Sequence, residues 1–148
     1  MNATGKRRLL ALAKFLRGLP AERFDMREWV GKDWKGGADL SCGTTACALG
    51  WATTMPLFRR LGLRLVHTGS IGGGYPQIGD GYALSGGRWE YARTGYHAAS
   101  FLFGITYEEA EYLFLPGSTR PGAPRETPKQ VARRIEAFVG RAEAGRGR

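Results

Sequence analysis

The stretch Cys42-Gly43-Thr44-Thr45-Ala46-Cys47-Ala48-Leu49-Gly50-Trp51-Ala52 holds both cysteines of the chain, two threonines and a run of small apolar residues. A threonine is suited to start a helix, and the residue before Pro56 is pushed out of the helical region. We therefore predict a helix from Thr44 or Thr45 to about Thr54, with Cys47 inside it. The stretch has three interpretations: an activated-thiol site, a metal knuckle, or the buried centre of a small core.

Apolar residues recur at helical spacing on both sides of this stretch. After a Thr4 cap, Leu9, Leu12 and Leu16 share one face, and Asp25 is suited to cap a helical turn that points Met26, Trp29 and Val30 inward. Two capping boxes, at 106–109 and 127–130, predict two more helix starts. We expect about six helices, near residues 4–17, 44–54, 57–61, 96–103, 106–114 and 127–142.

The segment Leu63 to His67 alternates in polarity and leads into a glycine-rich stretch, which predicts a small β-hairpin at about residues 63–84. The expected fold class is α+β, a mainly helical single domain spanning residues 1–148, with basic ends at 1–5 and 143–148 that fray. The predicted core consists of Leu9, Leu12, Leu16, Trp29, Cys47, Leu49, Trp51, Phe103, Leu113, Phe114, Val131, Ile135 and Phe138.

The net charge of +9 is concentrated at the two ends of the chain. Residues 1–17 contain five basic residues and no acid, and residues 133–148 contain five arginines against two glutamates. Such ends can be solvated faces or can contact a polyanion without sequence preference, through residues such as Lys6, Arg7, Arg8 and Arg141. Nucleic acid is therefore a partner to test.

No apolar run approaches the roughly 20 residues that span a bilayer, and Lys14 and Arg17 interrupt the apolar part of the N-terminus. We expect no membrane partner and a cytoplasmic location, which is the host cytoplasm if a phage encodes the chain. Two cysteines without a secretory pattern then favour reduced thiols over a disulfide.

A catalytic interpretation needs an activated thiol. A helix that begins at Thr44 or Thr45 places Cys42 just before its N-terminus, where backbone amides stabilise a thiolate, and His67 is the natural base. This order resembles that of papain-like amidases and peptidases of the cell-wall type, which makes a Cys/His hydrolase an alternative function. The competing interpretation is that Cys47 is a small buried apolar residue and Cys42 a turn residue.

A zinc site is a further alternative, with Cys42, Cys47, His67 and His97 as the four ligands. The two histidines are far apart in the sequence, and a second cysteine knuckle is missing. The glycines at 72–74 lack the Lys-Ser/Thr of a phosphate loop. We expect no cofactor.

Residues 99–105, followed by the Thr106 cap, have the spacing of a helix-turn-helix. The helix that would enter the DNA groove carries Glu108, Glu109 and Glu111 and no basic residue, so phosphates would repel it. We predict instead an αα-hairpin that packs on the core.

Several segments resemble a family of small bacteriophage and bacterial proteins with a Cys-Gly-Thr-x-Ala-Cys-Ala-x-Gly motif and no known activity. The resemblance rests on Phe24-Asp25-Met26, residues 42–52, Pro56-Leu57-Phe58 and segments at 98–104, 109–114 and 127–135. Relatives can have a histidine after the second glycine of the motif, where this chain has Trp51. The resemblance implies a phage or bacterial setting but no reaction.

The function we expect is that of a small non-enzymatic interaction protein of phage-accessory type, such as a host-takeover or anti-defence factor. Its partner would be a host protein, bound through charged surfaces and an aromatic, glycine-rich loop that contains Tyr75, Tyr82, Trp89 and Tyr91. The alternative for that loop is a lid over the protein's own core.

Overall fold

The computed structural model describes residues 1–37, 40, 43–67, 73–78, 84–85, 88–89, 93–117 and 120–145, with the backbone alone at 84–85 and 88–89. It confirms the α+β, mainly helical class. The described part has six α-helices and a short 3₁₀ helix at Ala21–Arg23. The helices are α1 (Ala3–Arg17), α2 (Ala48–Ala52), α3 (Pro56–Arg59), α4 (Gly95–Phe103), α5 (Tyr107–Phe114) and α6 (Pro128–Ala144).

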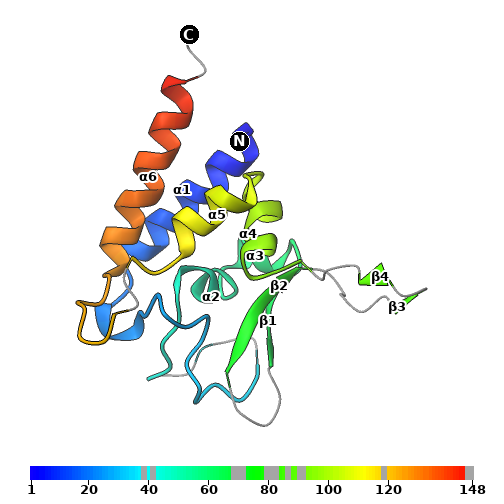
Figure 1. The fold of residues 1–148 in the computed structure, drawn as a ribbon, viewed down its shortest axis with the longest axis vertical. Coiled ribbons are helices and arrows are strands. Elements are labelled where there is room, and N and C mark those ends of the chain that lie inside the picture. The colour runs from blue at the N-terminus through cyan, green and yellow to red at the C-terminus, as the bar shows by residue number, and fades with distance from the viewer. Residues whose placement is uncertain are drawn as a thin grey trace.

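A three-stranded antiparallel sheet packs beside these helices (Figure 1). Its central strand β2 (Gly74–Ile78) pairs with β1 (Leu63–His67) on one side and with β5 (Arg93–Thr94) on the other. The β1–β2 pair is the predicted hairpin. A second ladder joins β3 (Leu84–Ser85) to β4 (Arg88–Trp89). The sequence did not predict β5, because two residues are too few to show a period.

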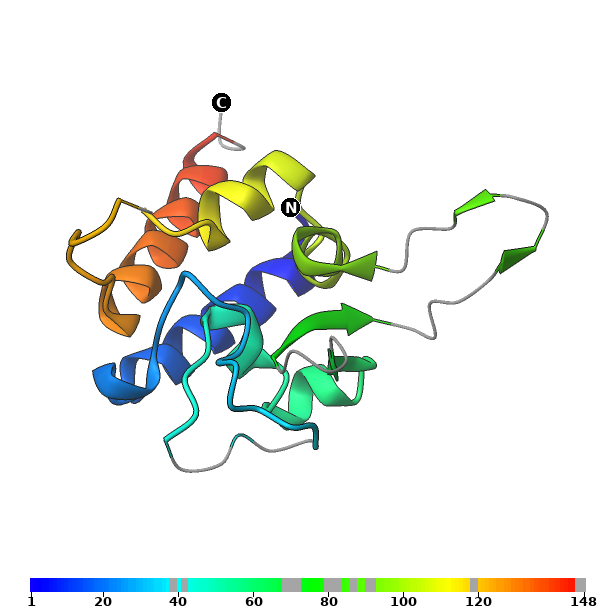
Figure 2. The ribbon, with the colours of Figure 1, turned by 60° about the horizontal axis from the view of Figure 1, so that its bottom comes forward.

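Helix α1 is the centre of the helical layer and packs on α6, α4 and α2 (Figures 1 and 2). Leu9, Leu12 and Leu16 are fully buried along its inner face, as their spacing predicts. Gly5 allows α1 to approach α4 closely, because a β-carbon there would lie 1.8 Å from the carbonyl oxygen of Phe103. None of the described helices is both long and apolar enough to cross a bilayer.

The predicted αα-hairpin is present as α4 and α5. Gly104 joins the two helices in a left-handed conformation (φ +61°), which glycine adopts without strain. Both capping boxes form: the Thr106 hydroxyl accepts from the Glu109 amide, and the Thr127 hydroxyl accepts from the Gln130 amide. Sequence spacing alone located these two helix starts.

Three local predictions differ from the structure. The N-cap of α1 is Asn2 rather than Thr4. The first turn of α1 therefore lies within residues 1–5, which were predicted to fray, and Gly5 in this turn is buried. Residues 25–30 contain a turn at Met26 and Arg27 rather than a helix; the Asp25 carboxylate accepts from the Arg27 amide at 3.0 Å, and Met26 and Val30 are buried as predicted. Helix α2 begins at Ala48, and its N-cap is Cys47, whose sulfur accepts a hydrogen bond from the Gly50 amide. The carbonyls of Thr45 and Ala46, which would accept bonds inside an earlier helix, accept instead from the amides of Gly31 and Asp25, and this explains the late start of α2.

Most of the predicted core is buried, but Trp29 and Phe138 are only partly so and pack on its edge. The prediction missed Phe24, Trp34 and Phe58, which are among the most enclosed aromatic residues. Trp34 lies between Gly31 and Gly36, outside any described helix or strand, and its side chain is only 4% exposed.

Candidate functional site

Residues 44–52 connect the loop of residues 23–31 to the core. The amides of Asp25, Cys47 and Gly31 donate to the carbonyls of Ala46, Glu28 and Thr45, at 3.1, 3.0 and 2.7 Å respectively. The Trp51 indole N–H adds a bond of 2.8 Å to the Arg23 carbonyl. These bonds use backbone groups that a helix from Thr44 would need, and they fix the path of the chain through Trp29.

Cys47 and Gly50 lie directly against the backbone of Trp29. The Cys47 sulfur is 3.7 Å from the Trp29 carbonyl oxygen, and a β-carbon on Gly50 would lie 1.9 Å from that oxygen. Burial raises the pKa of the Cys47 thiol to about 11, so the thiol stays protonated at neutral pH. Cys47 therefore serves as a buried cap and packing residue, which agrees with the core interpretation of this stretch.

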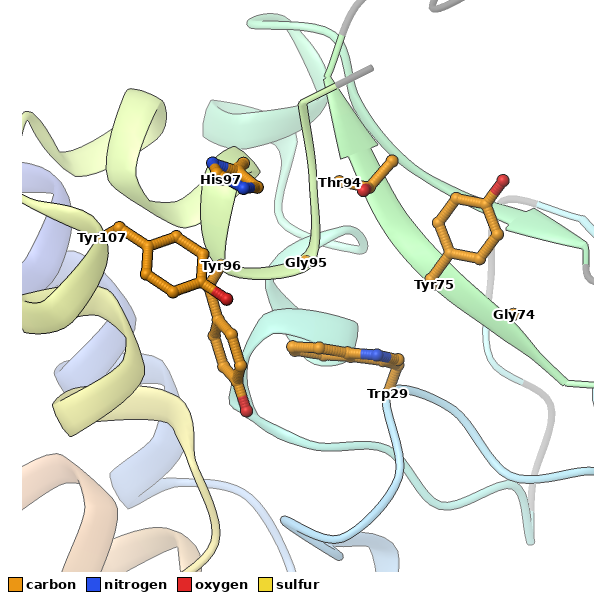
Figure 3. A pocket seen from close by; sticks show the side chains of 8 residues that line it. All are labelled: Trp29, Gly74, Tyr75, Thr94, Gly95, Tyr96, His97 and Tyr107. Carbon is orange, nitrogen blue, oxygen red and sulfur yellow. The ribbon is translucent and has the colours of Figure 1, made fainter. Parts of the chain in front are cut away.

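An open pocket of about 560 Å³ lies above the ring of Trp29 (Figure 3). Three segments that are distant in the sequence form it: the Trp29 loop, the start of β2 and the junctions that begin α4 and α5. Its lining consists of Trp29, Gly74, Tyr75, Thr94, Gly95, Tyr96, His97 and Tyr107. We call it the aromatic pocket.

Four rings of the aromatic pocket, those of Trp29, Tyr96, Tyr107 and His97, are linked by ring contacts. Trp29 and Tyr96 meet edge to face with their centroids 5.0 Å apart, and Tyr96 meets Tyr107 in the same way at 6.0 Å. His97 lies 4.6 Å from Tyr107. Such contacts hold each ring in one orientation, so the pocket is formed before any ligand arrives.

Two glycines keep the pocket open. Gly95 has a φ of +52°, and a β-carbon there would lie 3.2 Å from the Trp29 ring. A β-carbon on Gly74 would lie 2.5 Å from the Val66 carbonyl oxygen and 2.6 Å from the Trp34 ring. The aromatic pocket therefore depends on close backbone approaches that only glycine permits.

The described lining contains three phenols, an indole, an imidazole and a hydroxyl, but no lysine, arginine, aspartate or glutamate. Burial raises the pKa of Tyr96 to about 12, with smaller contributions from the charges of Cys47, Glu111 and Tyr107. Tyr96 thus remains a neutral hydrogen-bond donor at physiological pH. The pocket can supply aromatic faces and neutral polar groups to a ligand.

Of the four predicted aromatic binding residues, the structure describes the side chain of Tyr75 alone. Tyr75 lines the aromatic pocket, the side chain of Trp89 is not described, and Tyr82 and Tyr91 lie outside the described residues. The sequence interpretation missed Tyr96 and Tyr107 as pocket residues and assigned Trp29 to the core. The sequence signal for these two residues was weak. Tyr107 directly follows the helix cap Thr106, and Tyr96 is the second residue after the cap Thr94. At such positions a side chain can point away from the packed face of its helix.

The proposed thiol and zinc residues are only partly within the described chain. Cys42 lies outside it, so the pairing of Cys42 with His67 stays a prediction. His67 ends β1 with its ring 5.8 Å from that of Trp34, and His97 is at the aromatic pocket. Within the described residues, no three His, Cys, Asp or Glu side chains group as metal ligands.

Several basic side chains near the two ends of the chain contact other residues of the protein. Lys6 pairs with Glu143, and Arg17 forms a two-bond ion pair with Glu136 at 2.6 and 2.8 Å. The guanidinium of Arg8 donates to the Leu102 carbonyl at 2.7 Å. Arg7 donates to the hydroxyl of Thr4, and Arg141 lies over the ring of Tyr112. The contacts of Lys6 and Arg17 join α1 to α6, and that of Arg8 joins α1 to α4.

Comparison with known proteins adds no relative. No family model matches the chain, and neither a curated protein nor a solved structure matches it. The resemblance to small phage and bacterial proteins therefore stays a prediction.

Proposed function

We propose that the protein is a non-enzymatic interaction protein that binds another protein through the aromatic pocket. The observation that carries this proposal is the packed set of Trp29, Tyr96 and Tyr107 at an open pocket that Tyr75 also lines. Tryptophan and tyrosine supply large contact areas with few rotatable bonds, and they dominate the energetics of protein interfaces. If the phage resemblance holds, the partner is a host protein.

The outer face of α5 extends this surface. Tyr107, Tyr112 and Leu115 are 37%, 54% and 47% exposed, and a second hollow of about 440 Å³ lies beside the last two. Large exposed apolar side chains that gather beside a preformed pocket are typical of a binding surface. A partner that covers α5 would bury Tyr107 at the centre of the contact.

A binding role fits the chemistry of the pocket better than nucleophilic catalysis does. No cysteine is among its described lining, and the one described thiol, Cys47, is buried with a raised pKa. A nucleophile needs access to the substrate and a thiolate population near neutral pH. His97 and Thr94 are suited to hydrogen-bond a ligand.

Site-specific photo-crosslinking tests this proposal. A benzoylphenylalanine at position 107 should crosslink one protein from host lysate, while the same group at position 57 serves as the control. Leu57 is 43% exposed on α3 and lines none of the described pockets. With the purified partner, Tyr107→Ala should weaken binding by about thirtyfold, the effect of a hot spot worth about 2 kcal/mol. Equal crosslinking from both positions, or an unchanged Kd, would contradict the proposal.

A second candidate is nucleic-acid binding without sequence preference. It is favoured by the antiparallel packing of α1 on α6, which brings the two basic ends together (Figure 1). Arg7 and Lys14 are exposed on α1. If these residues contact phosphates, duplex affinity should fall with salt, and each substitution by glutamine should reduce the log–log slope by about 0.9. If neither substitution changed the slope of log affinity against log salt concentration, Arg7 and Lys14 would not contact nucleic acid.

A further inference from the structure

Three rings of the aromatic pocket, those of Trp29, Tyr96 and Tyr107, have no cation over them within the described part of the chain. The face of an aromatic ring is electronegative, so it attracts a cation within about 6 Å, and indole does so most strongly. Because these three rings meet at steep angles, a group in the pocket can contact more than one face.

Among the described residues, three aromatic rings outside the pocket have an arginine over one face. The guanidinium carbon of Arg93 lies 3.7 Å from the centroid of Phe101, and that of Arg23 lies 4.7 Å from Trp51. Arg141 covers Tyr112 at 5.9 Å. Among the described residues, Trp29, Tyr96 and Tyr107 have no arginine of this kind over them, so a cation from a partner would make the same type of contact with their faces.

Helix α5 places acidic groups next to the aromatic pocket. Tyr107 lines that pocket, while Glu108 and Glu111 line the neighbouring hollow. The arginine of that hollow, Arg134, is already bound to the Leu113 carbonyl and to Glu126. Neither Glu108 nor Glu111 has an ion pair within the described chain. Two carboxylates without a described ion pair therefore lie beside the pocket, on a protein that is positive overall.

We propose that the aromatic pocket binds one lysine or arginine side chain of a partner protein, held by Trp29, Tyr96 and Tyr107 with Glu108 and Glu111 alongside. This inference rests on the proposed protein-binding function and names the chemical group that enters the pocket. The partner's remaining contact surface is neutral or acidic, because the net charge of +9 repels a strongly basic surface. At physiological salt this repulsion is screened beyond about 8 Å, so it does not prevent one cation from entering.

The same features disfavour a nucleotide in the pocket. A base could stack on Trp29, but its phosphate would find no lysine or arginine among the described lining residues and would face Glu108 and Glu111. The observations therefore favour a cationic side chain over a nucleic-acid ligand.

The test uses the whole protein and short peptides Ac-Gly-Ser-X-Ser-Gly-NH₂ that differ only at X. Lysine is compared with norleucine and arginine with citrulline, so that each pair differs in charge at similar shape. The readout is the indole N–H resonance of Trp29, with those of the buried Trp34 and Trp51 as internal controls for folding. We expect the charged peptides to shift Trp29 and to bind about five- to thirtyfold more tightly than their neutral counterparts.

Two matched variants locate the effect. Tyr107→Leu removes a ring of the pocket and should abolish the preference for charge. Phe101→Leu removes an exposed ring that lines none of the described pockets, and it should keep the preference. Equal binding of charged and neutral peptides, or no shift of Trp29 by any peptide, would overturn the cation inference while leaving the crosslinking test of protein binding intact. A shift of Trp29 by oligo(dT) at lower concentration than by any peptide would overturn both proposals.

Discussion

Gly50→Ala tests whether residues 44–52 hold Trp29 in place. The added β-carbon would lie 1.9 Å from the Trp29 carbonyl oxygen and 2.8 Å from the β-carbon of Ala46. Real β-carbons do not approach other atoms so closely, and a backbone carbonyl cannot rotate away as a flexible side chain can. Helix α2 and the Trp29 loop must therefore separate.

Two opposing effects set the size of the change. Overpacking a tight contact costs about 1–3 kcal/mol, and the backbone contact at Gly50 argues for the upper end. Replacing glycine by alanine within a helix returns up to about 1 kcal/mol. We expect a net loss of about 2 kcal/mol, which lowers Tm by about 4–8 °C in a chain of this size.

Gly140→Ala is the matched control because Gly140 lies within α6 and a β-carbon there meets nothing within 4 Å. The control should gain about 0.5–1 kcal/mol from helix propensity alone. Urea denaturation followed by circular dichroism measures both variants. If Gly50→Ala were as stable as the parent or gained stability like the control, residues 44–52 would not pack on Trp29 as described.

Three further predictions concern ionisation and capping. Because the folded pKa of Cys47 is raised from 9.0 to about 11, the unfolded chain loses its proton first as pH rises. Urea titrations should show that the parent is about 1 kcal/mol less stable at pH 10 than at pH 8 and that Cys47→Ala does not lose this stability. A parent with equal stability at the two pH values would contradict the burial of Cys47. Hydrogen bonds from Arg27 lower the pKa of Asp25, so stability should fall below about pH 4, and Asp25→Asn should flatten that fall in acid titrations. An unchanged acid profile would count against this pairing. Thr127→Ala removes a cap of α6 and should cost about 1 kcal/mol in thermal melts; a change near zero would contradict the capping box.

The helices could be predicted from sequence where local chemistry determines their ends. Thr106 and Thr127 begin helices through bonds to residues three positions away, and Gly104 ends α4 through its own conformation. The hairpin was predictable because Leu63 and Ile78 both face the core at paired positions. These features depend on short stretches of chain, so spacing rules reach them.

The start of α2 and the aromatic pocket depend on contacts between distant segments. The Thr45 carbonyl accepts from the Gly31 amide, and the Cys47 amide donates to the Glu28 carbonyl. These hydrogen bonds to a distant segment replace the helical turn that local propensity favours. Tyr96 and Tyr107 are separated in sequence by most of α4 and come together only because the α4–α5 hairpin folds back. No periodicity in the sequence encodes that meeting.

Both binding proposals require that Trp29 is held in contact with Tyr96 as a wall of the aromatic pocket. A nuclear Overhauser spectrum of the labelled protein without ligand tests this claim directly. Rings whose centroids lie 5.0 Å apart, edge to face, should give clear cross-peaks between Trp29 and Tyr96, and Tyr96 should give them to Tyr107. A Trp29 indole with no contact to Tyr96 and the shifts of an exposed side chain would contradict the pocket and remove the basis of both binding proposals.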